Sequence, residues 1–163
     1  MIGLMKKDIT LVTPYRILCV CLGNICRSPT AEAIFKAKIK DFNIEVDSAG
    51  TAAYHIGSPP DLRSQTEAKK YGYNLSNLRA RQITLQDFDA FDLILAMDQQ
   101  NLENIQKLKP SSCRAHIAML DSQPIADPYY GGAQGFTRVL KQCEVAADQW
   151  LAKLIKQNKV IKK

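Results

Sequence analysis

Apolar and polar positions follow one another along this chain with two different periods. Short runs rich in apolar residues predict buried strands at 16–21, 44–48, 91–97 and 115–119. Longer segments in which apolar residues recur at helical spacing predict helices at 29–41, 98–109 and 136–154, with a further one after Pro60. Because strands and helices alternate, we expect an α/β fold, with a four-stranded, mainly parallel sheet and helices on both faces.

Residues that start and stop helices support these boundaries. Ser28 is suited to cap a helix that begins at Pro29, since a serine hydroxyl accepts a hydrogen bond from a free N–H group of the first turn. Asp98 is suited to cap the helix that ends before Pro110. Gly72 can close the helix that follows Pro60. The pattern shows neither an internal repeat nor a low-complexity linker.

Length and composition fit one globular domain. A chain of 163 residues with 46% apolar and 23% charged residues can bury a substantial core. We expect the domain to span residues 15–157, between an N-terminal extension at 1–14 and a basic C-terminal tail at 158–163. The five lysines from Lys153 onward suit a solvated helix end, because cations are favourable at the C-terminal end of the helix dipole.

Composition also narrows the location and the partners. No apolar run approaches the roughly 20 residues that span a bilayer, and the start lacks the apolar stretch of a signal peptide. The net charge of +6 fits an anionic substrate, but basic residues are not interleaved with aromatic ones as in nucleic-acid-binding modules. The five cysteines are an odd number in a chain too large to need disulfides. We therefore expect a cytoplasmic protein with neither membrane nor nucleic acid as a partner.

The cysteines and histidines do not follow the spacing of a metal site. Cys21 and Cys26 are separated by four residues, and no second pair follows them. The chain has only two histidines, His55 and His116. We expect neither a metal ion nor another cofactor.

The segment after the first predicted strand has the features of an anion-binding loop. It reads Cys-Leu-Gly-Asn-Ile-Cys-Arg-Ser over 21–28 and leads directly into a helix, whose N-terminus attracts negative charge. Arg27 adds a planar fork of donors that can hold two phosphate oxygens. Gly23 and Asn24 tolerate the positive φ that a tight loop needs. The loop also lies beyond the carboxyl end of a strand, where open α/β sheets bind ligands.

A cysteine at the base of such a loop is a candidate nucleophile. The positive potential that attracts phosphate also favours the thiolate of Cys21 over the thiol. Ser28 can donate a hydrogen bond to that thiolate. Cys19 is expected to point to the opposite face of the strand and to be an ordinary buried cysteine.

The whole string Cys-Leu-Gly-Asn-Ile-Cys-Arg-Ser-Pro at 21–29 closely resembles the phosphate-binding loop of the low-molecular-weight protein tyrosine phosphatases. The string Asp-Pro-Tyr-Tyr-Gly at 127–131 is similar to the acid loop of that family. Shorter similarities occur at 47–50, 57–61, 80–82 and 96–98, so the resemblance covers residues 15–156.

The resemblance implies a two-step phosphatase reaction. Cys21 would attack phosphorus to form a cysteinyl-phosphate, and Asp127 would protonate the leaving group and then act as a base on water. Arg27 would bind the phosphate and stabilise the transition state. The phosphate-binding loop would comprise Leu22, Gly23, Asn24, Ile25, Cys26, Arg27 and Ser28.

The resemblance also implies a cleft for a phosphotyrosine ring. Tyr129 and Tyr130 would form one wall, Tyr54 would form the opposite wall, and Ile25 would lie at the edge of the loop. Ile25 favours phosphotyrosine, because relatives that act on phosphoarginine carry threonine there. The expected partners are phosphotyrosine-containing proteins or peptides, with inorganic phosphate and other oxyanions binding in the loop. The protein is expected to be a monomer or a weak homodimer.

Two further positions matter within the resemblance. In the family, a second cysteine of the loop pairs with the nucleophile under oxidation, which makes Cys26 the expected redox partner of Cys21. Asn24 and Ser28 would hold the loop in shape, and in the family a serine that corresponds to Ser48 and a histidine contribute to the same polar network. Leu78 replaces that histidine, so part of the network must differ in this chain.

Three other functions compete with this interpretation. A protein-arginine phosphatase of the same fold is the main rival. A thioredoxin-coupled arsenate reductase would need two further cysteines in the helix after the third strand, and residues 97–108 contain none. A non-catalytic phosphate- or phosphopeptide-binding module is disfavoured, because Cys21, Arg27 and Asp127 are all present.

Overall fold

The computed structural model describes residues 13–163, and within them four strands alternate with helices in an α/β fold. The strands are β1 (Tyr15–Cys21), β2 (Ile44–Gly50), β3 (Leu93–Ala96) and β4 (His116–Met119). The helices are α1 (Arg27–Lys38), α2 (Leu62–Lys70), α3 (Asp87–Ala90), α4 (Gln99–Leu108) and α5 (Ala133–Lys156). Most of the expected N-terminal extension, residues 1–12, lies outside the described residues.

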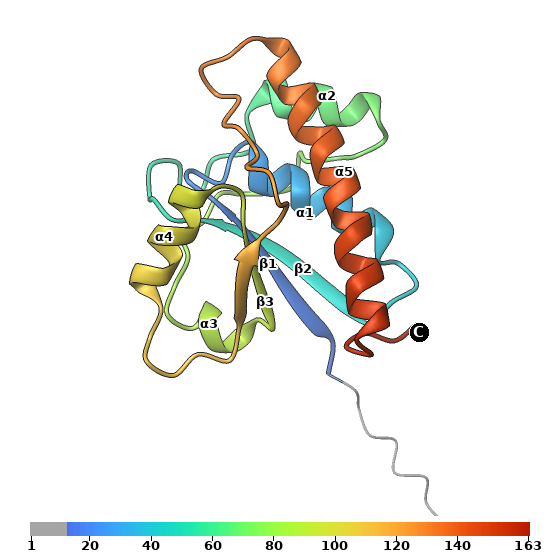
Figure 1. Ribbon diagram of the computed structural model, residues 1–163. Helices are drawn as coiled ribbons and strands as arrows, with labels where there is room; N and C mark the ends of the chain where they lie inside the picture. The colour runs from blue at the N-terminus through green and yellow to red at the C-terminus, as the bar shows by residue number, and fades with distance from the viewer. Residues whose placement is uncertain (1–12) are drawn as a thin grey trace, which may run out of the picture.

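The strands form one parallel sheet. Their order is β2-β1-β3-β4, so the chain moves from β1 to one side for β2 and to the other side for β3 (Figure 1). The register places Cys21 beside Gly50 and Val20 beside Ala96. Such a reversal opens a crevice at the carboxyl ends of the central strands, where α/β proteins bind ligands. The predicted four-stranded sheet is confirmed, and every strand pair in it is parallel.

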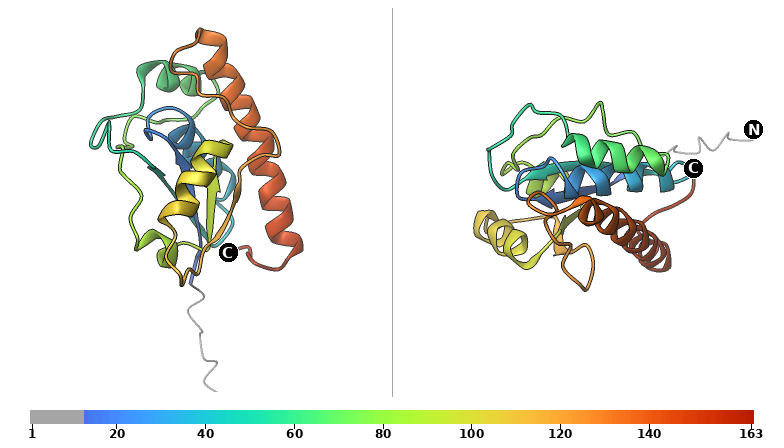
Figure 2. Two further views of the ribbon diagram at one scale, coloured as in Figure 1. Left: turned by 60° about the vertical axis from the view of Figure 1, so that its left-hand side comes forward. Right: turned by 90° about the horizontal axis from the view of Figure 1, so that it is seen from above.

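Helices cover both faces of the sheet, as predicted. On one face, α1 and α5 contribute Phe35 and Leu140 to an apolar cluster against the strands. On the other face, α3 and α4 contribute Phe88 and Ile105 to a second cluster. Both views of Figure 2 show α4 and α5 on different sides of the strands. The core is therefore two apolar layers separated by the sheet.

Cys19 lies on the same face of β1 as Cys21, which corrects the expectation that the two side chains point apart. Side chains alternate along a strand, so residues two positions apart share a face. Cys19 and Cys21 both belong to the cluster under α1 and α5. Leu18 and Val20 belong to the other cluster. Burial, with a smaller contribution from the nearby Glu32, raises the pKa of the Cys19 thiol well above its usual value.

Helix α1 begins at Arg27 rather than at Pro29, and Ser28 is not its cap. Cys26 occupies the capping position, and its side chain makes no capping hydrogen bond. Ser28 lies in the first turn with its hydroxyl 3.0 Å from the sulfur of Cys21. The serine hydroxyl is therefore used by the loop and not by the helix terminus.

The other helix ends follow the predicted signals more closely. The carboxylate of Asp98 accepts a hydrogen bond from the N–H group of Asn101 and caps α4, as predicted. Gly72 follows α2 with a φ of 86°, a left-handed conformation that suits glycine. Helix α3 is absent from the sequence prediction, because its four residues are too few to show a helical period.

The C-terminal segment packs against the domain, which differs from the solvated tail expected for residues 158–163. Val160 is 7% exposed and joins the apolar cluster beside α5. Lys162 forms an antiparallel bridge with Phe42, and the N–H group of Asn43 donates to the carbonyl group of Ile161. Val160, an apolar residue between the lysines, explains the difference, because its burial stabilises the packed arrangement.

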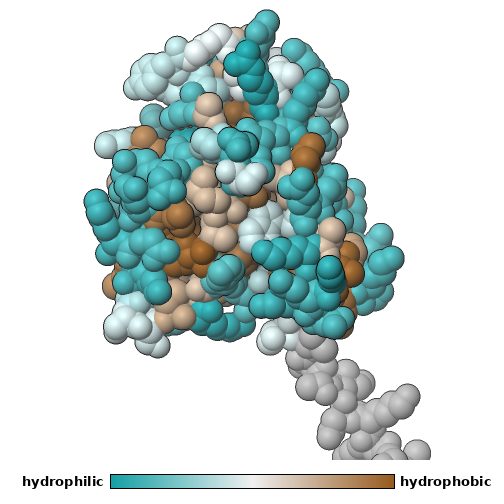
Figure 3. Space-filling model, viewed as in Figure 1, coloured by the Kyte–Doolittle hydropathy of each residue, from teal (hydrophilic) through white to brown (hydrophobic). Residues whose placement is uncertain are grey.

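The face of the molecule seen in Figure 3 is mainly hydrophilic. On the face seen in Figure 3, apolar side chains appear only in small patches between polar ones. Within residues 13–163, no helix combines the length and the apolarity that crossing a bilayer requires.

Candidate active site

The loop between β1 and α1 lies at the carboxyl edge of the sheet and forms the floor of a small cavity. The residues that line this cavity are Cys21, Leu22, Gly23, Ile25, Cys26, Arg27, His55, Asp127, Tyr129 and Tyr130. A larger cavity of about 570 Å³ lies beside α2, but its lining contains neither a cysteine nor an arginine. The chemistry of the lining therefore identifies the smaller cavity as the candidate active site.

Backbone hydrogen bonds hold two carbonyl groups of the loop against the neighbouring chain. The carbonyl groups of Leu22 and Ile25 accept hydrogen bonds at 3.0 and 2.8 Å from N–H groups of the chain between β2 and α2. Asn24 has a φ of 57°, the left-handed conformation predicted for it. Its N–H group points at the sulfur of Cys21 at 3.3 Å. With these carbonyl groups bonded outward, the loop suits an anion.

Two glycines allow close approach to the loop. A Cβ atom at Gly50 would lie 2.6 Å from the carbonyl oxygen of Leu22, so only glycine fits where β2 meets the loop. A Cβ atom at Gly23 would lie 3.0 Å from the Cδ2 atom of His55. The positive φ expected at Gly23 is not present, and within the loop that conformation belongs to Asn24.

The sulfur of Cys21 lies at the floor of the cavity. The residue is 3% exposed, so a reactant reaches the sulfur only through the cavity. The hydroxyl of Ser28 lies 3.0 Å from the sulfur, and the N–H group of Asn24 lies at 3.3 Å. Both groups can donate a hydrogen bond to the sulfur, which lies beside the N-terminal end of α1.

Arg27 lies beside Cys21 and is held by oxygen atoms from distant segments. Its Nη1 atom donates to the carboxylate of Asp98 at 2.5 Å and to the carbonyl group of Ile125 at 3.0 Å. Burial opposes the charge of Arg27, yet the neighbouring Cys21 and Asp98 outweigh it and raise the pKa of the guanidinium. Asp98 thus divides its two oxygens between the cap of α4 and Arg27.

Asp127 reaches the same cavity from the loop after β4. Its Oδ2 atom lies 3.6 Å from the Nη2 atom of Arg27, and its Oδ1 atom accepts from the N–H group of Tyr129 at 3.1 Å. The Asp127 side chain is 40% exposed, so it can exchange protons with water. The position of Asp127 suits an acid that acts on a group bound above Cys21.

Aromatic side chains form the walls of the cavity. Tyr129 and His55 both line it, with ring centroids 6.3 Å apart. Tyr130 is 93% exposed and meets Tyr129 edge to face. Tyr54, expected as the opposite wall, is 76% exposed and is not among the lining residues. The adjacent His55 lies there instead, because Gly23 leaves room for its ring.

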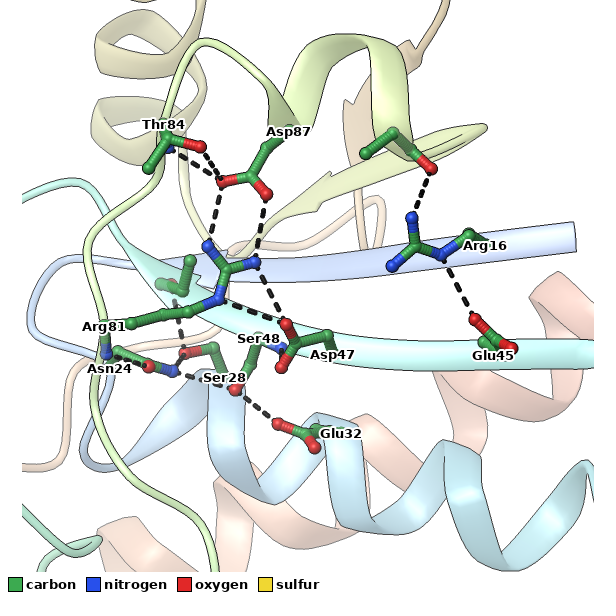
Figure 4. A network of polar contacts seen from close by, with 12 residues as sticks. Arg16, Asn24, Ser28, Glu32, Glu45, Asp47, Ser48, Arg81, Thr84 and Asp87 are labelled. Atoms are coloured by element: carbon green, nitrogen blue, oxygen red, sulfur yellow. Dashed lines mark hydrogen bonds and ion pairs between the residues drawn. The ribbon is translucent and has the colours of Figure 1, made fainter. Parts of the chain in front are cut away.

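A buried polar network supports the loop from beneath (Figure 4). The side-chain amide of Asn24 donates to the hydroxyls of Ser28 and Ser48 at 2.8 and 2.9 Å. The side-chain oxygen of Asn24 accepts from the N–H group of Arg81 at 3.0 Å. The Ser48 hydroxyl donates to the buried carboxylate of Glu32 at 2.6 Å. The network is therefore continuous from Glu32 on α1 to Ser28 under the loop.

The same network ties the loop to the rest of the sheet edge. The guanidinium of Arg81 forms a bidentate pair with Asp87 and a further ion pair with Asp47 on β2 (Figure 4). Leu78, which replaces the histidine implied by the resemblance, is partly buried against the apolar cluster under α1 and α5.

Sequence reasoning identifies the loop and Asp127 but misses part of their surroundings. It misses His55, Glu32, Arg81 and the contact between Asp98 and Arg27. Asp98 carries a usable signal, because it follows a buried strand at the edge where ligands bind. Glu32 also carries one, since it is a charged residue three positions before the buried Phe35 and so lies on the same side of α1. His55 and Arg81 lie outside the helices and strands, so no periodicity marks them, although Arg81 lies in the segment 80–82 that resembles the family.

Cys26 lines the cavity beside Cys21. Burial raises the pKa of its thiol to about 12, although a hydrogen bond with Ser64 opposes the shift. Cys26 is therefore protonated at neutral pH. All five cysteines of the chain are free in the structure.

Comparisons with known proteins agree with this geometry. The family model for low molecular weight phosphotyrosine protein phosphatase matches residues 16–160. The Homo sapiens protein of that name is 46% identical over 139 residues, which cover 78% of this chain and 87% of the relative. A crystal structure of a protein tyrosine phosphatase from Entamoeba histolytica has a TM-score of 0.82 and 35% identity, and the match covers 88% of this chain and 99% of that one. A Drosophila arginine phosphatase has a TM-score of 0.79 and 34% identity, and the match covers 84% and 96% of the two chains.

The match spans most of the chain and includes both the loop at 21–28 and the segment that carries Asp127. Sequence identity and fold therefore agree with the arrangement of side chains around the cavity. The chain belongs to the low molecular weight phosphotyrosine protein phosphatase family.

Proposed function

We propose that this protein hydrolyses phosphotyrosine in proteins or peptides through a cysteinyl-phosphate intermediate on Cys21. The observation that carries the proposal is the convergence on one cavity of the Cys21 sulfur, the Arg27 guanidinium and the Asp127 carboxyl group. These groups supply a nucleophile, a fixed positive charge and an acid. Together they meet the needs of phosphoryl transfer to sulfur without a cofactor.

In the first step, the thiolate of Cys21 attacks phosphorus while the bond from phosphorus to the phenolic oxygen breaks. The loop N–H groups and Arg27 balance the negative charge on the non-bridging oxygens. Asp127 enters this step protonated and gives its proton to the leaving oxygen, so that tyrosine leaves as a neutral phenol.

In the second step, water attacks the phosphorus of the cysteinyl-phosphate. The carboxylate of Asp127 now accepts a proton from that water. The bond between phosphorus and sulfur breaks, inorganic phosphate forms, and Cys21 leaves as a thiolate. The Ser28 hydroxyl, 3.0 Å from the sulfur, stabilises the departing thiolate.

The walls of the cavity support an aryl substrate. A phenyl ring that enters above Cys21 would meet aromatic surface at the cavity wall, from Tyr129 and His55. Cys21 is buried at the floor, so the phosphoryl group must be carried at the end of a long side chain. Phosphoserine is too short for this, and Ile25 adds an apolar edge that favours the tyrosine ring.

A kinetic comparison on peptides of one sequence tests the substrate class. We expect the kcat/KM for the phosphotyrosine peptide to exceed those for the phosphoserine and phosphoarginine peptides by about tenfold or more. Activity should persist in the presence of a metal chelator, and vanadate should inhibit competitively with respect to the phosphorylated peptide. Equal rates on phosphoserine would contradict the proposed cleft.

A protein-arginine phosphatase is the second candidate, because a Drosophila arginine phosphatase is among the similar structures. Phosphoarginine is also long enough to reach a buried sulfur. The position of Ile25 at the rim disfavours it, since an isoleucine offers no hydrogen bond to a guanidinium. A higher kcat/KM for the phosphoarginine peptide would replace phosphotyrosine with this substrate.

We also propose that peroxide converts Cys21 and Cys26 into a reversible disulfide. The Cys21 thiolate would be oxidised to a sulfenic acid, with peroxide reduced to water, and the Cys26 sulfur would then displace water to form the disulfide. The raised pKa of Cys26 supports this order, because a protonated thiol reacts slowly with peroxide. Peptide mapping after peroxide treatment should show the linked pair. Sulfonic acid on Cys21 with no linked peptide would exclude it.

We propose the cytoplasm as its compartment and a monomer or weak homodimer as its state. Five free cysteines fit a reducing environment. Sedimentation measured at increasing protein concentration tests the assembly, and a stable higher oligomer would contradict it.

A further inference from the structure

We propose that Glu32 is a positioning residue for the reaction. Its carboxylate fixes the direction of the hydrogen bonds beneath the loop, and so determines which donor faces the sulfur of Cys21. The inference rests on the proposed role of Cys21 as nucleophile. Glu32 is 3% exposed and lies on α1 beneath the loop (Figure 4), and it is not among the residues that line the cavity.

The charge of Glu32 is balanced locally. A buried carboxylate is costly unless it is paired and hydrogen-bonded. Its Oε2 atom pairs with the amino group of Lys36, one turn further along α1, where the lysine is about half exposed. Its Oε1 atom accepts from Ser48 at 2.6 Å. Both carboxylate oxygens therefore have partners, one outside the network and one within it.

A carboxylate imposes a direction, because it can only accept hydrogen bonds. Ser48 must give its single proton to Glu32, so it can only accept from the Asn24 amide. From the other side, the backbone N–H group of Arg81 can only donate, and it occupies the side-chain oxygen of Asn24. The Asn24 amide is thereby held from both sides with its NH₂ group toward the two serines.

The direction continues to the sulfur. Ser28 accepts from Asn24 at 2.8 Å, so its own proton must go elsewhere. Two acceptors are in reach, the sulfur of Cys21 at 3.0 Å and the carbonyl oxygen of Ala49 at 3.4 Å. The sulfur is closer, so the hydroxyl donates to it. That donor stabilises the thiolate as a leaving group when the cysteinyl-phosphate is hydrolysed.

Phosphate binding depends on other contacts. The loop backbone is held by hydrogen bonds to Leu22 and Ile25 from the chain between β2 and α2. Arg27 is held by Asp98 and Ile125. None of these contacts involves Glu32. Loss of the Glu32 acceptor should therefore slow thiolate departure while leaving affinity for the phosphoryl group unchanged.

Substitutions at Glu32 test the inference. Glu32→Met keeps the length of the side chain but removes the acceptor, so we expect kcat to fall about tenfold. Because only the second step is slowed, KM should fall together with kcat, so kcat/KM and the inhibition constant for inorganic phosphate should stay within about twofold of the wild-type values. Glu32→Gln keeps one acceptor oxygen for Ser48 and should restore kcat to within about twofold. Circular dichroism melting establishes that each variant is folded.

A matched control and a double-mutant cycle complete the test. Glu45→Met makes the same substitution at the exposed ion pair with Arg16 on the sheet, and should leave kcat unchanged. Ser48→Ala cuts the network next to Glu32 and should lose kcat to the same degree. In the Ser48→Ala background, Glu32→Met should cause no further loss of kcat. If Glu32→Met does not fold, the kcat of the single variant Ser48→Ala tests the network instead.

Several results would overturn the inference. They are a folded Glu32→Met variant with wild-type kcat, an equal loss in Glu32→Gln, wild-type kcat in Ser48→Ala, or additive losses in the double variant. The proposed function is tested separately by wild-type turnover and its loss in Cys21→Ser. If the wild type turns over substrate and Cys21→Ser does not, an unexpected result for the Glu32 variants counts against the positioning role alone.

Discussion

At the scale of single residues, the site consists of one arginine and two carboxyl groups arranged around the sulfur of Cys21. Arg27 carries the positive charge beside Cys21, and its position is set by Asp98. Asp127 is left more exposed, with its carboxyl group 3.6 Å from the guanidinium. In the proposed reaction the same aspartate gives a proton in one step and accepts one from water in the next, and its exposure lets water reach it.

The role of Asp127 is tested by its dependence on the leaving group. Asp127→Ala should lower kcat/KM on phosphotyrosine about 10²- to 10³-fold, because a phenolate must then leave without a proton in the first step. The loss should be much smaller on aryl phosphates whose phenols are strongly acidic. Steady-state kinetics on a series of aryl phosphates measures this slope. A uniform loss across the series would contradict the acid role.

Residues of the site differ in how far the sequence reveals them. Cys21 and Arg27 lie in one short segment after a strand, so their proximity follows from local order. The contact between Arg27 and Asp98 joins residues far apart in the chain, and depends on β1 and β3 being neighbours. His55 takes the place expected for Tyr54 because of how one irregular segment turns, which no periodicity encodes.

At the scale of elements, the end of β2 helps to set the conformation of the loop at 21–28. Gly50 is paired with Cys21 in the sheet register, and its N–H group donates to Arg81. The missing side chain of Gly50 allows the carbonyl group of Leu22 to approach. The shape of the loop is therefore imposed partly by its neighbour strand and only partly by its own sequence.

Gly50→Ala should disturb the loop. The new Cβ atom would lie 2.6 Å from a backbone oxygen, which must move. We expect kcat/KM to fall about tenfold or more, since small displacements of reacting groups are costly. Gly132→Ala is the matched control, because a Cβ atom there meets nothing within 4 Å. Equal kcat/KM values for the two variants would contradict the packing argument.

Elements differ in predictability for physical reasons. The central strands are predicted because burial on both faces makes them short apolar runs, and the long helix α5 because burial imposes a helical period on many residues. The start of α1 is misplaced because Ser28, a good capping residue, is instead turned toward Cys21. The C-terminal segment is misjudged because its lysines obscure Val160, which is buried through a contact with a distant part of the chain.

At the scale of the whole molecule, α5 is tied to the segment after α2 by a polar contact. The Tyr73 hydroxyl donates to the Glu144 carboxylate at 2.6 Å. Burial first, and then this hydrogen bond, raise the pKa of Tyr73 from 10.0 to about 12. The folded state thus holds this proton more tightly than the unfolded state, so Tyr73 contributes stability that depends on pH.

That contribution should be fully present below about pH 10 and lost as the pH rises from about 10 to 12. Melting temperatures of the wild type and Tyr73→Phe, measured from about pH 8 to 12, test it. The advantage of the wild type should shrink over the upper part of this range. The raised pKa of Cys26 acts equally in both proteins and cancels in the difference. A constant difference would contradict the assignment.

The central claim is that the phosphoryl group passes through the sulfur of Cys21. Rapid mixing with an aryl phosphate, acid quenching and peptide mapping by mass spectrometry measure this directly. We predict a burst of released phenol matched by phosphate on the peptide that contains Cys21, with neither signal in Cys21→Ser. Full turnover with no phosphate on that peptide, or turnover by Cys21→Ser, would contradict the account.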